Sequence, residues 1–360
     1  MRSLIDICDF STEELYDLMA CATDIIDNPD KYRDSLKGKI LATLFFEPST
    51  RTRLSFESAM LGLGGSVLGF SGAGNSSAAK GETMADTAQV VSHYADIIAT
   101  RHPLEGAPLV ASENASIPVI NAGDGGHCHP TQTLADILTI YREIGRLDHL
   151  RVGFCGDLKY GRTVHSLISA LSRYEGNEIV LISPDELKLP CYIKQDVIEA
   201  NGMKCTEVRE MDEVMPALDV LYMTRVQGER FSSYDEYLRL RDVYTLTTDK
   251  MNLAKEDMIV LHPLPRVNEI AVEVDSDPRA AYFRQAMNGK FMRMALILKL
   301  IKDSEDKTKV SRVRGEGIVH DIPCQNPRCI TVNERGLRPS ARINLDGIHR
   351  CVYCDSIVKK

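Results

Sequence analysis

The residues best suited to chemistry follow an apolar run near the N-terminus. Residues 40–46 are apolar, and the chain then continues Glu47-Pro48-Ser49-Thr50-Arg51-Thr52-Arg53. This pattern predicts a buried strand followed by the start of a helix, where backbone N–H groups and the helix dipole favour an anion. Two arginines in a first helical turn oppose the dipole, so a simple capped surface helix explains them poorly. We therefore predict an anion-binding site here.

Polar clusters also follow six other apolar runs. They are Ser71 to Lys80, Arg101-His102-Pro103, Asn121 to His129, Asp157 to Arg162, Arg225-Val226-Gln227 and His262 to Arg266. Cations and hydrogen-bond donors dominate them, and planar arginine forks suit phosphate and carboxylate. We expect the basic side chains to converge on one cleft, with His129 and Gln132 at the start of a helix; they are Arg51, Arg53, Lys80, Arg101, Arg162, Arg225 and Arg266.

The elements that position these clusters alternate between short β-rich runs and amphipathic stretches. Predicted strands are 40–46, 65–70, 96–100, 117–121, 151–156, 179–182, 219–224 and 257–261. The clearest helical patterns are 51–62, 82–94, 131–144 and 163–174. Such alternation predicts an α/β protein with parallel, doubly wound sheets, in which ligands bind at the carboxyl ends of strands. Each polar cluster above follows a predicted strand.

The alternation also predicts the domain organisation. A first domain spans 1–145, a second spans 146–279, and an amphipathic helix at about 280–303 returns to complete the first. The wholly polar run 302–309 has the composition of a linker, and 310–360 forms a separate small module.

Composition excludes several classes of protein. The 360 residues are 44% hydrophobic and 26% charged, as in ordinary globular proteins, and the net charge of −8 disfavours a general nucleic-acid binder. No apolar run is long enough to span a membrane, so we expect no membrane partner. The N-terminus lacks an apolar signal core, which favours a cytoplasmic location. No P-loop or dinucleotide fingerprint follows a predicted strand.

The motifs, in order and spacing, resemble the aspartate branch of the transcarbamoylase family over most of residues 1–305. They are Pro48 to Arg53, Ser76-x-x-x-Lys80-Gly81-Glu82-Thr83, Arg101-His102-Pro103, His129-Pro130-Thr131-Gln132, Asp157 to Thr163, Met223 to Gln227 and His262 to Arg266. The resemblance implies carbamoyl transfer from carbamoyl phosphate to L-aspartate, which gives N-carbamoyl-L-aspartate and phosphate in pyrimidine biosynthesis. It implies that 1–145 binds carbamoyl phosphate and that 146–279 binds aspartate.

The same resemblance implies a role for each site residue. The residues for the phosphate are Ser49, Thr50, Arg51, Thr52 and Arg101, and those that polarise the carbamoyl carbonyl are Thr52, Arg101 and His129. Gln132 and the carbonyls of Pro263 and Leu264 would hold the carbamoyl amino group. The aspartate carboxylates would bind Arg162, Arg225 and Gln227. Ser76 and Lys80 would enter from a neighbouring subunit of a homotrimer, and Glu47 would pair with Arg162 and Arg230 on closure.

Two other functions compete with this interpretation. The ornithine branch shares the Ser-Thr-Arg-Thr-Arg motif, but a cationic second substrate requires acidic partners, and a cysteine would be expected in the turn at 262–265. A catalytically silent scaffold would be marked by loss of key polar residues. Arg51, Lys80, Arg101 and His129 are all present, which favours an enzyme.

The C-terminal module carries its own signature. Cys324 and Cys329, then Cys351 and Cys354, form two pairs at the separation of a tetrahedral structural zinc site, and we expect one ion per chain and no organic cofactor. The alternatives are free thiols or two disulfides, and a reducing compartment disfavours the latter. Residues 310–360 hold four more basic than acidic side chains, and a Zn(Cys)₄ centre would cancel about two of these charges. Nucleic acid is therefore not the favoured partner.

The module resembles the zinc domain of the regulatory chain found with aspartate-branch enzymes, here fused behind the catalytic chain, and this resemblance implies a small C-terminal zinc-binding β domain. The resemblance implies that the module braces trimers or links them into larger assemblies. It also implies that the nucleotide-binding domain of that regulatory chain has no counterpart here.

Three single residues have structural interpretations. His127, Cys128 and His129 rarely form a metal site without a distant ligand, so we interpret His129 as a helix-start residue. We expect His262 to brace the turn at 263–265, and Cys155 to lie in the core.

Overall fold

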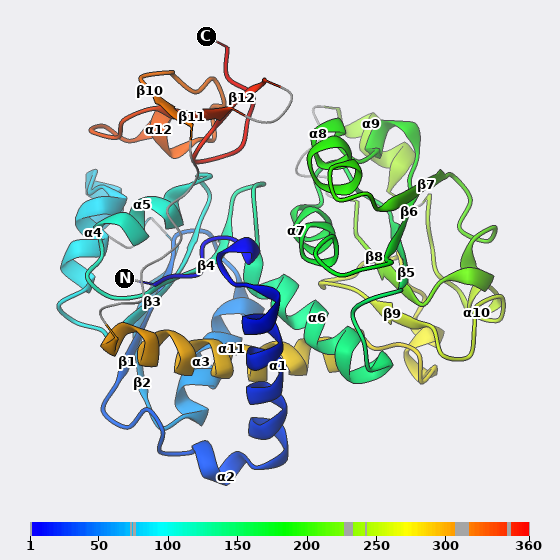
Figure 1. The fold of residues 1–360 in the computed structure, drawn as a ribbon, viewed down its shortest axis with the longest axis horizontal. Helices are drawn as coiled ribbons and strands as arrows, with labels where there is room; N and C mark the ends of the chain where they lie inside the picture. Colours follow the sequence, from blue (N-terminus) through cyan, green and yellow to red (C-terminus); the bar gives the residue numbers. More distant parts are fainter. Residues whose placement is uncertain are drawn as a thin grey trace. The chain divides into compact units, whose positions relative to one another are not determined.

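The computed structural model describes residues 2–72, 74, 77–226, 233–241, 243–306, 317–343 and 347–359. Backbone contacts divide the chain into two compact units, one made of residues 1–131 and 290–360 and the other of residues 132–289 (Figure 1). No described helix is long and apolar enough to cross a membrane.

The first unit is built on a four-stranded parallel sheet. Its strands are β1 (Ile40–Phe45), β2 (Ser66–Ser71), β3 (Ile97–His102) and β4 (Val119–Asp124), in the order β2-β1-β3-β4. All six residues of β4 are buried, as are all of β1 except Ile40, which explains their nearly continuous apolar sequences. The strand order reverses between β1 and β3.

Helices connect and cover these strands. They are α1 (Thr12–Asp27), α2 (Pro29–Tyr32), α3 (Thr50–Gly62), α4 (Met84–Val91), α5 (Ala107–Asn114) and most of α11 (Tyr282–Glu305). A capping box begins α1: the Ser11 hydroxyl accepts from the Glu14 N–H at 3.2 Å, and the Glu14 carboxylate accepts from the Ser11 N–H at 3.0 Å.

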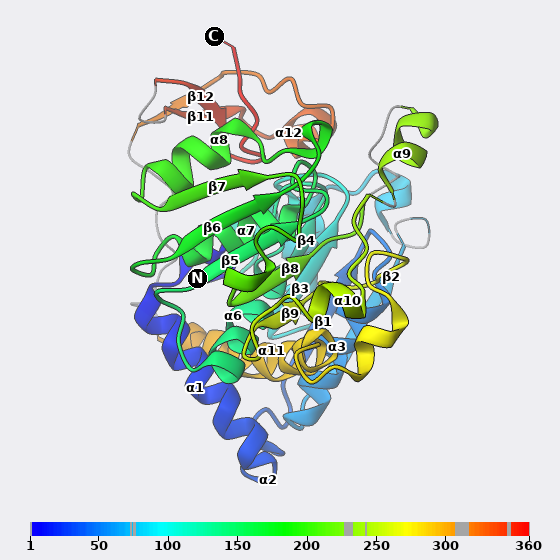
Figure 2. The same cartoon turned by 90° about the vertical axis from the view of Figure 1, so that its right-hand side faces the viewer.

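The second unit is a five-stranded parallel sheet with its own helices (Figure 2). Its strands, in the order β7-β6-β5-β8-β9, are β5 (Arg151–Cys155), β6 (Glu178–Ile182), β7 (Lys204–Val208), β8 (Val220–Met223) and β9 (Ile259–Leu261). The helices are α6 (Pro130–Ile144), α7 (Arg162–Leu171), α8 (Cys191–Ile193) with a π-helical turn at Lys194–Glu199, α9 (Tyr234–Leu240) and α10 (Thr248–Met251). The order reverses between β5 and β8, so the predicted pair of doubly wound parallel sheets is confirmed.

The C-terminal module is a small antiparallel sheet. It contains β10 (Ile318–His320), α12 (Ile330–Asn333), β11 (Ser340–Ile343) and β12 (His349–Cys351). Its buried side chains join the apolar core that α4 and α5 form with the first sheet, and these contacts lie within the first unit. The expected small β domain is thus present.

Three elements differ from the sequence predictions. The helix predicted at 82–94 ends at Val91, where the Ser92 hydroxyl donates to the Ala88 carbonyl at 2.7 Å. Strand β7 was missed because it lies at a sheet edge and its sequence is mostly polar and exposed. Helix α11 continues to Glu305 through the start of the predicted linker, because Asp303 is buried and pairs with Lys299 at 3.1 Å.

Candidate active site and cysteine module

The point where the strand order of the first unit reverses brings two predicted motifs together. The Phe46 N–H donates to the Arg101 carbonyl at 2.9 Å, so the segment after β1 runs beside the end of β3. The Arg101 side chain is 12% exposed, and its Nε lies 3.3 Å from Oε2 of Glu47. A cation that is mostly shielded from solvent at a switch point is suited to an anionic ligand. Glu47 contacts Arg101 here; of its predicted closure partners, Arg162 belongs to the second unit and Arg230 lies outside the described residues.

The start of α3 offers further donors. Ser49 is the N-cap but makes no side-chain cap hydrogen bond; its hydroxyl donates to the Thr52 hydroxyl at 3.1 Å instead. The helix therefore presents its first N–H groups without a side-chain cap, as anion sites require. Thr50 and Arg51 are exposed beside them. Arg53 was predicted to converge with the other basic side chains, but its guanidinium pairs with Glu57 at 2.6 Å.

His129 lies buried at the end of the loop before α6. Its Nδ1 is 3.5 Å from the Thr131 hydroxyl, which also contacts Arg293 Nη2 at 3.5 Å. Arg293 donates in addition to the Ser55 hydroxyl at 3.1 Å and lies over the Phe56 ring. This arginine links α3 to the His129 segment. Sequence reasoning missed it, although a lone arginine within the apolar stretch of α11 was a usable signal.

The remaining predicted residues of the first unit belong to the segment between β2 and α4. Lys80 ends a short 3₁₀ helix at Ser77–Lys80 and is exposed. Ser76 lies outside the described residues, as do Gln227 and Arg230 of the second unit.

In the second unit, Arg162 and Arg225 follow neighbouring strands. Arg162 begins α7 after β5, and Arg225 stands two residues after β8, which pairs with β5. The buried Thr224 hydroxyl accepts from the Asp157 N–H at 2.9 Å and donates to the Cys155 carbonyl at 3.0 Å. It thereby joins the two loops at the switch point. Cys155 is fully buried in the core, as predicted.

Gln132 is oriented by a buried carboxylate. Its Nε2 donates to Oδ1 of Asp136 at 2.7 Å, and the same oxygen accepts from Gln285 Nε2 at 2.6 Å. Oδ2 of Asp136 accepts from the Tyr222 hydroxyl at 3.2 Å. This bond fixes the orientation of the Gln132 amide, whose carbonyl oxygen is its acceptor for a ligand N–H.

The turn after β9 is braced by His262, as predicted. Its Nδ1 accepts from the Leu264 N–H at 2.7 Å, so Nε2 carries the proton that it donates to Glu269 at 2.8 Å. Burial lowers the pKa of His262 despite the opposing effect of Glu269, which keeps the ring neutral. Leu264 has a φ of +53°, in the left-handed region, and its N–H is the group that His262 accepts from, so the ring braces this turn. Arg266, which follows this turn, was predicted to converge with the other basic side chains, but it pairs with Asp275 instead.

The departure of Arg266 has a local cause. Its guanidinium forms a two-pronged ion pair with Asp275 and contacts the Tyr282 hydroxyl at 3.0 Å. Its charge is thus balanced inside the second unit.

The four C-terminal cysteines form one buried cluster. Their sulfur atoms all lie within 4.8 Å of one another, with Cys324 to Cys354 at 3.6 Å and Cys329 to Cys351 at 3.7 Å. These separations are far longer than a disulfide bond. Tetrahedral zinc with Zn–S bonds of about 2.3 Å requires sulfur atoms about 3.8 Å apart. The cluster therefore fits a closed metal site, which supplies folding energy rather than chemistry.

The second cluster that could hold a metal contains Asp124, His127 and Cys128. Both ring nitrogens of His127 already meet carboxylates: Nδ1 lies 2.9 Å from Asp124 and Nε2 3.0 Å from Asp355 of the module. Burial alone would lower the pKa of His127, but the two carboxylates raise it well above its usual value. This geometry is that of an imidazolium between two acids, in which neither ring nitrogen of His127 is left to bind a metal.

Comparison with family models gives two matches. Residues 2–142 match "Aspartate/ornithine carbamoyltransferase, carbamoyl-P binding domain", and residues 148–300 match "Aspartate/ornithine carbamoyltransferase, Asp/Orn binding domain". The cysteine module lies after both.

Relatives and solved structures agree with these matches. An aspartate carbamoyltransferase catalytic subunit of Lachnoclostridium phytofermentans is 62% identical over 301 residues, 84% of this chain and 98% of that one, and that of Clostridium acetobutylicum is 61% identical over 300 residues, 83% and 98%. The catalytic subunit of M. jannaschii aspartate transcarbamoylase superimposes with a TM-score of 0.80 at 48% identity, covering 85% of this chain and 100% of that one. The Trypanosoma cruzi aspartate transcarbamoylase in complex with carbamoyl phosphate and aspartate gives 0.78 at 42% identity, covering 83% and 96%.

Proposed function

This chain belongs to the aspartate/ornithine carbamoyltransferase family, and we propose that it transfers the carbamoyl group of carbamoyl phosphate to the amine of L-aspartate. The products are N-carbamoyl-L-aspartate and phosphate, and the reaction commits carbon and nitrogen to pyrimidine synthesis. The observation that carries the choice of aspartate is that Arg162 and Arg225 follow the neighbouring strands β5 and β8 at the switch point. Two guanidinium groups suit a dicarboxylate, whereas ornithine is cationic.

The first unit supplies the carbamoyl-phosphate half of the site. Phosphate is held by the hydroxyls and N–H groups that begin α3 and by two arginines; these residues are Ser49, Thr50, Arg51, Thr52 and Arg101. Thr52, Arg101 and His129 polarise the carbonyl. The support for Arg101 is its shielded guanidinium, which already contacts a carboxylate, that of Glu47.

The second unit supplies the aspartate half. Arg162, Arg225 and Gln227 bind the two carboxylates. Gln132, through the carbonyl oxygen of the amide that Asp136 orients, accepts from the carbamoyl amino group together with the carbonyls of Pro263 and Leu264. Ser76 and Lys80 act in the site of a neighbouring copy, so the working unit is a homotrimer.

The reaction needs no covalent intermediate. The neutral amine of aspartate attacks the carbamoyl carbon, an oxyanion develops on the carbonyl oxygen, and phosphate leaves with the bonding electron pair and takes up the proton that the amine loses. Fixed donors aimed at the oxyanion accelerate this step, and one such donor contributes about 3 kcal/mol. Holding both substrates in register contributes further.

The proposal also assigns each part of the chain to a domain. Residues 1–145 with 280–303 form the carbamoyl-phosphate domain, 146–279 the aspartate domain, and 310–360 a zinc domain like that of the family's regulatory chain. One zinc ion held by Cys324, Cys329, Cys351 and Cys354 stabilises this module. The enzyme works in the cytoplasm, and the module braces trimers or links them.

The test is product formation by the purified, zinc-loaded enzyme given carbamoyl phosphate with aspartate or with ornithine. Carbamoylated amino acid and phosphate are measured together. Turnover with aspartate alone supports the proposal, and turnover with ornithine refutes the role of Arg162 and Arg225. Silence with both amino acids from folded protein favours the scaffold function instead.

A further inference from the structure

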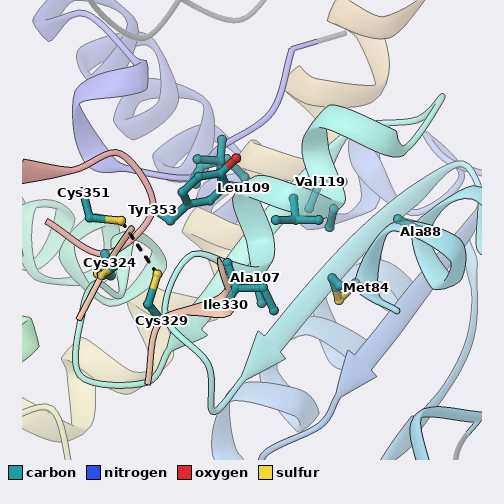
Figure 3. Close-up of a cluster of buried hydrophobic side chains, with 14 of the residues drawn as sticks. Met84, Ala88, Ala107, Leu109, Val119, Cys324, Cys329, Ile330, Cys351 and Tyr353 are labelled. Carbon is teal, nitrogen blue, oxygen red and sulfur yellow. Dashed lines mark hydrogen bonds between the residues drawn. The ribbon is translucent and has the colours of Figure 1, made fainter. Parts of the chain in front are cut away.

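The cysteine module shares a hydrophobic core with the carbamoyl-phosphate half of the chain. Ile330 and Tyr353 of the module pack in one cluster with Ala107 and Leu109 of α5 (Figure 3). A Cβ on Gly106, which has φ of +86°, would lie 2.6 Å from Tyr353 Cβ. The absence of a side chain at residue 106 thus allows the close approach. The module is therefore packed on α5 through a shared hydrophobic core.

Glu105 is the first polar link across that interface. Its N–H donates to the Arg328 carbonyl at 2.8 Å, and its carbonyl accepts from the Ile330 N–H at 2.9 Å, so its backbone pairs with the segment around Cys329. Its carboxylate accepts from Asn326 Nδ2 at 2.6 Å and from the Gly126 N–H at 3.1 Å. Glu105 follows Arg101 by four residues in the β3–α5 loop.

Glu334 is the second link. Both of its carboxylate oxygens lie 3.0 Å from the N–H of Met84, the first residue of α4. The acid sits at the helix N-terminus, where a negative charge is favoured, and it is held there by α12, which immediately follows Cys329. The segment that carries Lys80 ends at this helix start.

His127 is the third link. It joins Asp124 at the end of β4 to Asp355, which follows Cys354 in the chain. A 2.7 Å ion pair from Arg342 holds Asp355 on the module side. His127 is two residues before His129, so this contact fixes the loop that carries the proposed carbonyl-polarising histidine.

The three contacts have one feature in common. In each of them, the residue that meets the module lies within four positions of a residue that we propose to contact substrate. We propose that the cysteine module positions the carbamoyl-phosphate half-site, through Glu105, Glu334 and His127, so that metal binding to the module and carbamoyl-phosphate binding strengthen each other. This inference rests on the proposed function. The three side chains are positioning residues, because they act on Arg101, Lys80 and His129 rather than on substrate.

The coupling has a direct thermodynamic consequence. A metal held by four thiolates orders the segments around Cys329 and Cys354, from which the contacts to Glu105 and His127 are made. If that order improves phosphate affinity, bound phosphate must raise metal affinity by the same factor. Couplings of this kind are typically about 5- to 150-fold.

The first experiment separates positioning from general damage. Glu334→Ala removes the contact to α4, Glu334→Gln keeps an acceptor there, and Asp321→Ala removes an exposed ion pair with Arg338 inside the module as a matched control. In zinc-loaded enzyme we expect Glu334→Ala to raise the KM for carbamoyl phosphate about 3- to 10-fold, with kcat and the KM for aspartate within twofold. Glu334→Gln should recover most of this loss, and Asp321→Ala should match wild type. An unchanged KM for carbamoyl phosphate in Glu334→Ala would overturn the proposal.

The second experiment uses wild-type protein, so it does not depend on a variant that folds. Zinc is titrated out by a chromogenic chelator with and without saturating carbamoyl phosphate, and in parallel with inorganic phosphate. We expect either ligand to raise the chelator concentration needed for half-removal at least fivefold. Identical curves would refute the coupling even if turnover with aspartate is normal. Absence of turnover with normal zinc protection would instead refute the proposed function and leave phosphate binding coupled to the module.

Discussion

At the scale of single residues, the charge of Arg101 is not enough for the role proposed for it. Its guanidinium contacts Glu47 through Nε and the Ala122 carbonyl, at 3.5 Å, through Nη1, a planar two-nitrogen geometry that the single nitrogen of a lysine does not reproduce. We expect Arg101→Lys to lower kcat/KM for carbamoyl phosphate about 100-fold, the effect of losing one oxyanion donor. Steady-state kinetics at saturating aspartate measure this.

The matched control is Arg53→Lys. Arg53 has the same charge and lies close in sequence, but Glu57 already engages it, so its replacement should change kcat/KM less than about threefold. Equal losses in the two variants would contradict the assignment of Arg101.

Asp136 provides a second residue-scale prediction. Asp136→Asn places an amide N–H₂ against at least one of the donors from Gln132, Gln285 and Tyr222, which leaves a buried donor unsatisfied. We expect a loss of about 2 kcal/mol in the free energy of unfolding and a fall in kcat as Gln132 loses its orientation. Denaturant unfolding and turnover measure the two effects. Tyr222→Phe removes the hydroxyl's 3.2 Å bond to Asp136 and its bond to Thr163, so it should cost about 1–2 kcal/mol and leave kcat unchanged.

Sequence reasoning at this scale succeeds where function depends on residue type and local spacing. The four cysteines were predicted as one cluster because the separations within each pair are short and thiolates rarely group without reason. Arg293, Glu105 and Glu334 were missed because their partners lie far away in the chain. The contact between Met84 and Glu334 spans 250 residues, and no local pattern encodes it.

At the scale of elements, the start of α1 depends on one carboxylate. Burial raises the pKa of Glu14, but its bonds to Arg2 at 2.5 Å and the Ser11 N–H, with the Lys299 charge 3.5 Å away, lower that pKa to about 2. The stabilisation is therefore present above the unfolded-state pKa of about 4.3 and is lost as pH falls toward 2. We expect Glu14→Gln to cost about 1–2 kcal/mol at pH 7, allowing for solvent screening.

The measurement is the difference in Tm between Glu14→Gln and wild type from pH 7 to pH 2.5. That difference should shrink steadily below pH 4.5. Both proteins release a thiolate-bound metal in the same acidic range, so comparing them isolates Glu14. A difference that is constant with pH would contradict the ionised pairing of Glu14.

The boundaries of helices and strands could likewise be predicted only where the local sequence specifies them. The buried strands β1, β5 and β8 were predicted to within two residues at each end, because continuous apolar runs bounded by polar clusters specify them. The exposed edge strand β7 has no such run. The end of α11 depends on Asp303, whose burial among Lys299 and Arg2 is a tertiary effect.

At the scale of the molecule, the alternation of strands and helices predicted both parallel sheets, and it predicted that the polar clusters follow their strands. The reversal of strand order then explains why the motifs after β1 and β3, or after β5 and β8, are neighbours. The docking of the module on α4 and α5 could not be predicted, because Ile330, Tyr353 and Leu109 are ordinary apolar residues until packed.

The proposed trimer makes a prediction about mixed assemblies. Lys80 is exposed at the end of its 3₁₀ helix, and we propose that it acts in the site of a neighbouring copy, whereas Arg101 acts in its own. Lys80→Ala and Arg101→Ala proteins should each be nearly inactive. After equal amounts are dissociated and reassembled together, about a quarter of the sites contain both intact residues, as closed cyclic symmetry requires. Activity should recover toward that fraction, with light scattering reporting the trimer. Each variant reassembled alone is the control, and no recovery in the mixture would place Lys80 in its own copy's site.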